Sequence, residues 1–147
     1  IDFDSSAIRT AQRLYRLPNI DFILGDIRED IPSGPYKNVV WDAAIEHFTE
    51  KEIMNLMRRI KEVLTPDGVL SGYTIRARNH GGFHLHHHEY EFENKEDLAR
   101  FFRPWFKNVQ ILETEYTDRT NFYFFATDET LPFQNKNRVL VTSNKET

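Results

Sequence analysis

The segment from Val39 to Phe48 reads Val-Val-Trp-Asp-Ala-Ala-Ile-Glu-His-Phe and is the most specific indication of the fold. It opens with an apolar run behind the turn-forming residues 32–35, so we expect a short buried strand there. Directly after it, Thr49-Glu50-Lys51-Glu52 has the pattern of a capping box, in which Thr49 and Glu52 satisfy free amides at a helix start. The sequence therefore predicts a strand, a polar loop at its carboxyl end, and a helix.

Strands and helices go on alternating downstream. The helix that begins at Thr49 carries an apolar stripe and ends at Thr65-Pro66-Asp67-Gly68, a tight turn in which the glycine can take a positive φ. The stripe consists of Ile53, Leu56, Met57, Ile60 and Leu64. The elements expected after the turn are a strand over 69–75, a long connection over 76–93, a helix capped by Asn94, and strands over 109–115 and 121–127. Only five polar residues separate the last two strands, which favours an antiparallel pair.

The same alternation holds upstream of Val39. Ser5 or Ser6 can cap a helix that stops at Pro18-Asn19. Its apolar face would contain Ala7, Ile8, Ala11, Leu14 and Tyr15. A second short apolar run, Ile20 to Leu24, ends at Gly25-Asp26 and predicts another buried strand.

This order of elements predicts an α/β fold with a doubly wound, mostly parallel sheet and a C-terminal antiparallel strand pair. Residues 1–133 would form one domain and 134–147 a polar C-terminal tail. In such sheets ligands bind beyond the carboxyl ends of the strands, so the residues that follow each strand are the candidate site residues.

Composition excludes several classes of function. The net charge of −4 and the scattered basic residues give no field for collecting phosphates, so we expect no nucleic-acid partner. With no cysteine in the chain, neither disulfides nor thiolate metal sites can form. No apolar run reaches the roughly 20 residues that cross a bilayer, and the acidic start is unlike a signal peptide, so we expect a cytoplasmic protein without membrane contacts.

Four segments placed at predicted strand ends resemble class I S-adenosylmethionine-dependent methyltransferases: residues 1–8, 20–27, 39–48 and 64–70. In that family the residue before the strand at 39–41 is usually an aspartate, and Asn38 stands there in this sequence. The resemblance implies methyl transfer from S-adenosylmethionine to an unidentified small-molecule acceptor. Two alternatives stay open: a non-catalytic methyltransferase-like domain for binding or oligomerisation, including a homo-oligomer, and a histidine-rich metal-dependent enzyme.

The resemblance also implies which residues hold the cofactor. Asp2, with Asp4 as the alternative, would accept both ribose hydroxyls, because one carboxylate can take two hydroxyl hydrogens. Asp26 would accept from the adenine amino group, while Ile27 and Trp41 would line the cofactor site.

The family's first strand and glycine-rich cofactor loop have no counterpart in the sequence. Gly81-Gly82 follows the wrong strand to replace that loop. We therefore expect an N-terminally truncated methyltransferase fold, and we expect these 147 residues alone to bind the cofactor weakly or not at all.

Five of the six histidines crowd the connection after the predicted strand 69–75, at positions 80, 84, 86, 87 and 88. Three hypotheses compete: a metal site, a general base for the acceptor, and polar loop residues without chemistry. As catalytic candidates we select His47, His86 and His88, and we assign no metal ligand because no cysteine pair supports one.

Overall fold

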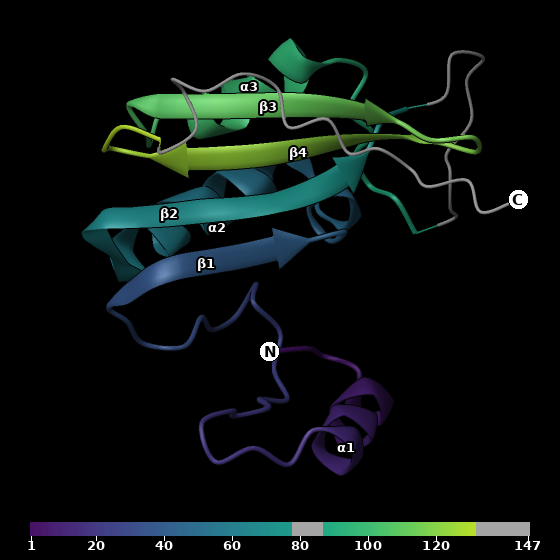
Figure 1. The fold of residues 1–147 in the computed structure, drawn as a ribbon, viewed down its shortest axis with the longest axis vertical. Coiled ribbons are helices and arrows are strands. Elements are labelled where there is room, and N and C mark those ends of the chain that lie inside the picture. Colours follow the sequence, from purple (N-terminus) through teal and green to yellow (C-terminus); the bar gives the residue numbers. More distant parts are fainter. Residues whose placement is uncertain (78–86, 132–147) are drawn as a thin grey trace, which may run out of the picture.

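The computed structural model describes residues 1–77 and 87–131. Its sheet has the strand order β1-β2-β4-β3, as Figure 1 shows. The strands are β1 (Tyr36–Asp42), β2 (Leu64–Ile75), β3 (Asn108–Glu115) and β4 (Thr120–Thr127). β1 pairs with β2 in parallel, and β4 is antiparallel to both of its neighbours, β2 and β3. Three strands therefore run one way and only β4 runs back, which confirms the predicted mostly parallel α/β sheet with a closing antiparallel pair.

Two helices cover one face of the sheet, α2 (Glu50–Val63) and α3 (Lys95–Phe102), while α1 (Ser5–Leu14) lies beyond the free edge of β1 (Figure 1). The predicted capping box of α2 forms, with the Glu52 amide donating to the Thr49 hydroxyl and the Thr49 amide to the Glu52 carboxylate. Asn94 caps α3 as predicted by accepting from the Asp97 amide at 2.9 Å. Within the described residues, helices thus cover one face of a sheet that the sequence predicts to be covered on both.

The core lies between the sheet and these two helices. The predicted apolar stripe of α2 is fully inside it and meets the inward-facing aromatic residues of β4 and α3. Its largest fully buried side chains include Ile53, Leu56, Met57, Leu70, Phe101, Phe102, Phe122 and Phe124. A fully buried side chain of this size is worth about 1.5–3 kcal/mol relative to its exposed state, so this layer carries most of the stability.

The N-terminal part departs from the prediction in two respects. The run from Ile20 to Leu24 forms no strand; it makes a single parallel bridge, between Leu24 and Asp2, because its pairing partner turns away into α1 directly after Asp2. In α1 the N-cap is Asp4 instead of a serine, since its carboxylate accepts from the Ser6 amide at 2.7 Å. Of the apolar face predicted for this helix only Ile8 is buried, whereas Leu14 and Tyr15 are 60% and 58% exposed.

Two details of β1 and β2 also differ. Val40, predicted to be buried, is 65% exposed because it alternates with Val39 and Trp41 and so faces the side of the sheet that no described helix covers. Gly68 lies inside β2 and does not take a positive φ; a Cβ there would lie 2.9 Å from both the Leu64 side chain and the Thr65 carbonyl oxygen. Close packing, and not turn geometry, therefore requires glycine at this position.

Within the described residues no helix combines the length and the apolar character needed to cross a membrane. The predicted tail 134–147 falls outside the described residues, as does His86.

Candidate functional site

A groove of about 850 Å³ separates the N-terminal segment and the turn after Leu24 from the free edge of β1. An acid stands on each wall, Asp26 after Leu24 on one and Asp42 at the end of β1 on the other. The lining residues include Asp2, Asp26, Ile27, Trp41, His47 and Phe48. All four residues predicted to bind a cofactor, together with the predicted catalytic residue His47, therefore face one groove.

Asp2 is held at the groove by two backbone hydrogen bonds. Its amide donates to the Ile23 carbonyl and its carbonyl accepts from the Gly25 amide, both at 3.0 Å. Its carboxylate accepts from the Asp4 amide at 2.8 Å, whereas the carboxylate of Asp4 caps α1. Of the two acids proposed for the same task, Asp2 is thus the one that lines the groove.

Asp26 begins a tight turn, where its carbonyl accepts from the amides of Glu29 and Asp30. Its carboxylate accepts from the Arg28 side chain through two oxygens, and this pairing holds the pKa of Asp26 below its ordinary value against the opposing effect of burial. Asp26 is therefore ionised at neutral pH and can only accept hydrogen bonds.

Arg59 of α2 fixes the turn that carries these residues. Its guanidinium donates to the carbonyl oxygens of Ile27 and Arg28 at 2.9 Å and of Glu29 at 3.1 Å. Only 19% of the Arg59 side chain is exposed, so these hydrogen bonds tie the turn to the core helix. The groove wall at Asp26 and Ile27 is thereby built on a rigid element.

Trp41 and Phe48 form the apolar floor of the groove, with ring centroids 5.6 Å apart. Trp41 is buried, and its indole nitrogen has no hydrogen-bond partner among the described residues. Between them, Ala43 takes a φ of 46°, a conformation that residues with a Cβ rarely adopt. The backbone is therefore strained directly at the carboxyl end of β1, where functional loops commonly store strain.

His47 and His88 meet beside this floor. His47 lies in the 3₁₀ helix η1 (Ile45–His47), and its Nδ1 is 3.0 Å from the His87 carbonyl oxygen. The His47 and His88 rings are in edge contact with centroids 5.1 Å apart, and His88 is buried. Two of the three predicted catalytic histidines are therefore brought together, although only His47 lines the groove.

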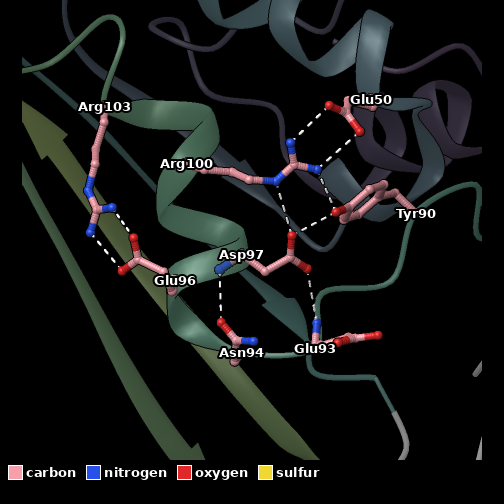
Figure 2. Close-up of polar contacts among 8 residues, drawn as sticks. All are labelled: Glu50, Tyr90, Glu93, Asn94, Glu96, Asp97, Arg100 and Arg103. Carbon is pink, nitrogen blue, oxygen red and sulfur yellow. Dashed lines mark hydrogen bonds and ion pairs between the residues drawn. The ribbon is translucent and has the colours of Figure 1, made fainter.

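A polar network on α3 anchors the chain that follows His88, as Figure 2 shows. The Arg100 guanidinium donates to the carboxylates of Glu50 and Asp97 and to the Tyr90 hydroxyl, which itself donates to Asp97 at 2.7 Å. Because Glu50 begins α2, the network joins both helices to the segment around Tyr90. Salt bridges between side chains this exposed each contribute little to stability. Because Tyr90 and Asp97 share hydrogen bonds with Arg100 and with each other, the network holds these three side chains in one arrangement.

Sequence reasoning missed Glu46, which is only 2% exposed and accepts from the Thr74 hydroxyl at 2.9 Å. The signal was present, because Glu46 directly precedes His47 after a predicted strand. It also missed Arg28 and Arg59, whose roles depend on contacts with Asp26 and with residues 27–29 that no local spacing reveals.

A family described as a methyltransferase domain matches residues 1–68, the part of the chain that contains Asp2, Asp26, Trp41 and His47. Solved structures give a match that extends over most of the chain. Methyltransferase SibL in its apo form is 11% identical, with a TM-score of 0.69 over 88% of this chain and 43% of its own. The chain has the class I S-adenosylmethionine-dependent methyltransferase fold.

Two further structures share this methyltransferase fold. Human N-acetylserotonin methyltransferase in complex with S-adenosylmethionine is 16% identical, with a TM-score of 0.65 over 88% of this chain and 39% of its own. LepI in complex with the same compound is 9% identical, with a TM-score of 0.62 over 86% of this chain and 35% of its own. The chain thus spans less than half the length of these three structures. Among curated proteins, no sequence is significantly similar to it.

Proposed function

We propose that the protein transfers a methyl group from S-adenosylmethionine to a small-molecule acceptor. The observation that carries the proposal is that Asp2 and Asp26, from two chain segments joined by a parallel bridge, face the same groove. The methyltransferase fold and the family match over residues 1–68 support it. Fold alone does not determine function, so the residues that line the groove must have the chemistry that the cofactor needs.

The groove fits an adenosine group in its chemistry. The two carboxylates are acceptors for ribose hydroxyls and for an amino group, and Ile27 with Trp41 supplies apolar surface for a flat ring. A volume of about 850 Å³ lies within the range of about 300–1,000 Å³ common for ligand pockets. Three Arg28 nitrogens, the amide, Nε and Nη2, donate to the Asp26 carboxylate, which leaves about one of its roughly four acceptor positions for an amino group.

The bound cofactor supplies an activated methyl group on a sulfonium sulfur. The contribution of the chain is to hold the acceptor in line with that methyl group and to exclude water, for which the apolar floor of Trp41 and Phe48 is suited. An acceptor hydroxyl or amine that must lose a proton needs a base as well. We propose His47, which lines the groove, as this base; with its Nδ1 proton donated to the His87 carbonyl, Nε2 would be the nitrogen that accepts the proton.

The proposal is tested by titrating the protein with S-adenosylhomocysteine and following Trp41 fluorescence. Trp41 and Trp105 are the only tryptophans, so the variant Trp105→Phe makes Trp41 the sole reporter. The sequence left weak binding and no binding open, and the groove favours weak binding. Because the described groove contacts only the nucleoside end, we expect saturable binding with a dissociation constant of about 1 mM. A fluorescence signal that stays flat at several times this concentration, in a protein with an intact circular dichroism spectrum, would refute the proposal that this groove holds the cofactor.

A further inference from the structure

We propose that Glu46, His47 and His88 form a binding site for a divalent transition metal ion, with zinc as the best fit. The three residues each present one ligand atom, and these atoms lie within 4.8 Å of one another. Glu46 and His88 are 2% and 6% exposed, so the cluster is part of the interior and not a chance meeting of surface groups. The sequence alone indicates no metal ligand, whereas the structure brings the buried Glu46 carboxylate next to the two imidazoles.

Each of the three side chains has a second partner that orients it. The His47 Nδ1 faces the His87 carbonyl at 3.0 Å, and the His88 Nδ1 faces the Glu91 carboxylate at 2.9 Å. Both contacts place a proton on Nδ1, so Nε2 carries the lone pair that a metal requires. Thr74, itself fully buried, donates to one carboxylate oxygen of Glu46. Such carbonyl and carboxylate contacts behind the ligands are the usual support of metal sites in proteins.

The backbone also holds the two halves of the cluster together. The amides of Glu89 and Tyr90 donate to the Glu46 carbonyl at 2.9 and 3.1 Å, which clamps the segment after His88 onto η1. Tetrahedral zinc ligands at about 2.1 Å from the ion are about 3.4 Å apart, so small side-chain rotations would complete the site. The backbone therefore does not need to move for an ion to bind.

The ligand set points to the class of ion. Two imidazoles and one carboxylate suit zinc, iron, cobalt or manganese better than calcium or magnesium, which prefer oxygen ligands throughout. Three protein ligands leave at least one position for water or for an acceptor oxygen, and His47 borders the groove. Metal binding does not depend on the proposed methyl transfer; if both hold, His47 serves as a ligand in place of a base.

The test is a titration of the chelator-treated, dialysed protein with Zn²⁺, followed by calorimetry, and with Co²⁺, followed by visible absorption. We expect one equivalent to bind to the wild type. His88→Asn and Glu46→Gln should each weaken binding at least about tenfold, while the matched control His84→Asn, which removes a histidine of the same crowded segment, should not. Glu46→Gln keeps an oxygen that can accept from Thr74, so it tests the ligand charge with little change in shape.

Two further measurements make every outcome decisive. Circular dichroism and the thermal midpoint in chelator, recorded for each variant, separate lost ligands from lost folding. X-ray absorption at the zinc edge should show nitrogen and oxygen ligands at about 2.0–2.2 Å, including two imidazoles. A folded Glu46→Gln or His88→Asn variant with unchanged affinity, or a loss of binding in His84→Asn equal to theirs, would overturn the proposal in favour of adventitious binding by histidines outside the cluster.

Discussion

Replacing Gly72 with alanine is expected to destabilise the protein by about 3 kcal/mol or more, which should abolish folding at moderate urea concentrations. A Cβ at Gly72 would lie 2.1 Å from the Trp41 carbonyl oxygen and 2.6 Å from the Phe124 ring. The first is backbone of the paired strand β1 and the second a fully buried core ring, so neither can move aside cheaply. The measurement is equilibrium urea unfolding followed by circular dichroism.

Gly25→Ala is the matched control for this prediction. A Cβ there would lie 3.2 Å from the end of the flexible Ile1 side chain, so a small rotation relieves the contact and the unfolding midpoint should hardly change. Equal unfolding midpoints for the two variants would show that β2 does not approach the Trp41 backbone of β1 as closely as described.

The second large effect concerns ligand binding. Asp2→Ala and Asp26→Ala should each lower the affinity for S-adenosylhomocysteine about tenfold or more, and the double variant should show no saturable binding. Hydrogen bonds to a charged group are worth about 1.5–3 kcal/mol, and about 1.4 kcal/mol corresponds to a factor of ten. The measurement is the Trp41 fluorescence titration in the Trp105→Phe background.

Asp30→Ala serves as the control for these variants, since its side chain is 94% exposed and lies outside the groove lining. It removes an equal charge from the same turn and should leave the affinity unchanged. If Asp30→Ala weakened binding as much as Asp26→Ala, the net charge of the turn and not a direct contact would explain the effect.

Much of the fold followed from local sequence patterns. The capping box at Thr49 and Glu52, the α2 stripe and the closing hairpin are determined by residues close in sequence, and all three formed. Two predictions were wrong, the burial of Val40 and the strand at residues 20–24. Both depend on which other segment of the chain packs against these residues. A sequence pattern shows that a residue is apolar, but its burial depends on the segments that pack against it in the fold.

The resemblance to class I methyltransferases indicated Asp2, Asp26 and His47, and all three line one groove although residues 20–24 form no strand. Their roles in binding and catalysis stay predictions. The partnership of Glu46 with His88 was not predictable, since 41 residues separate them and their contact depends on how the segment 87–91 folds back on η1. Arg28 shares this limit, because its hydrogen bonds to Asp26 depend on the shape of one turn.

We propose that one nucleoside lies between Asp2, Asp26 and Trp41. The most direct measurement is the amide and indole NMR spectrum of the ¹⁵N-labelled protein during addition of S-adenosylhomocysteine. We expect the largest shifts on the amides of residues 25–27 and on the Trp41 indole, with little change along β3 and β4. Shifts confined to the hairpin of β3 and β4, or no shifts at all in a folded protein, would show that the nucleoside does not bind in this groove.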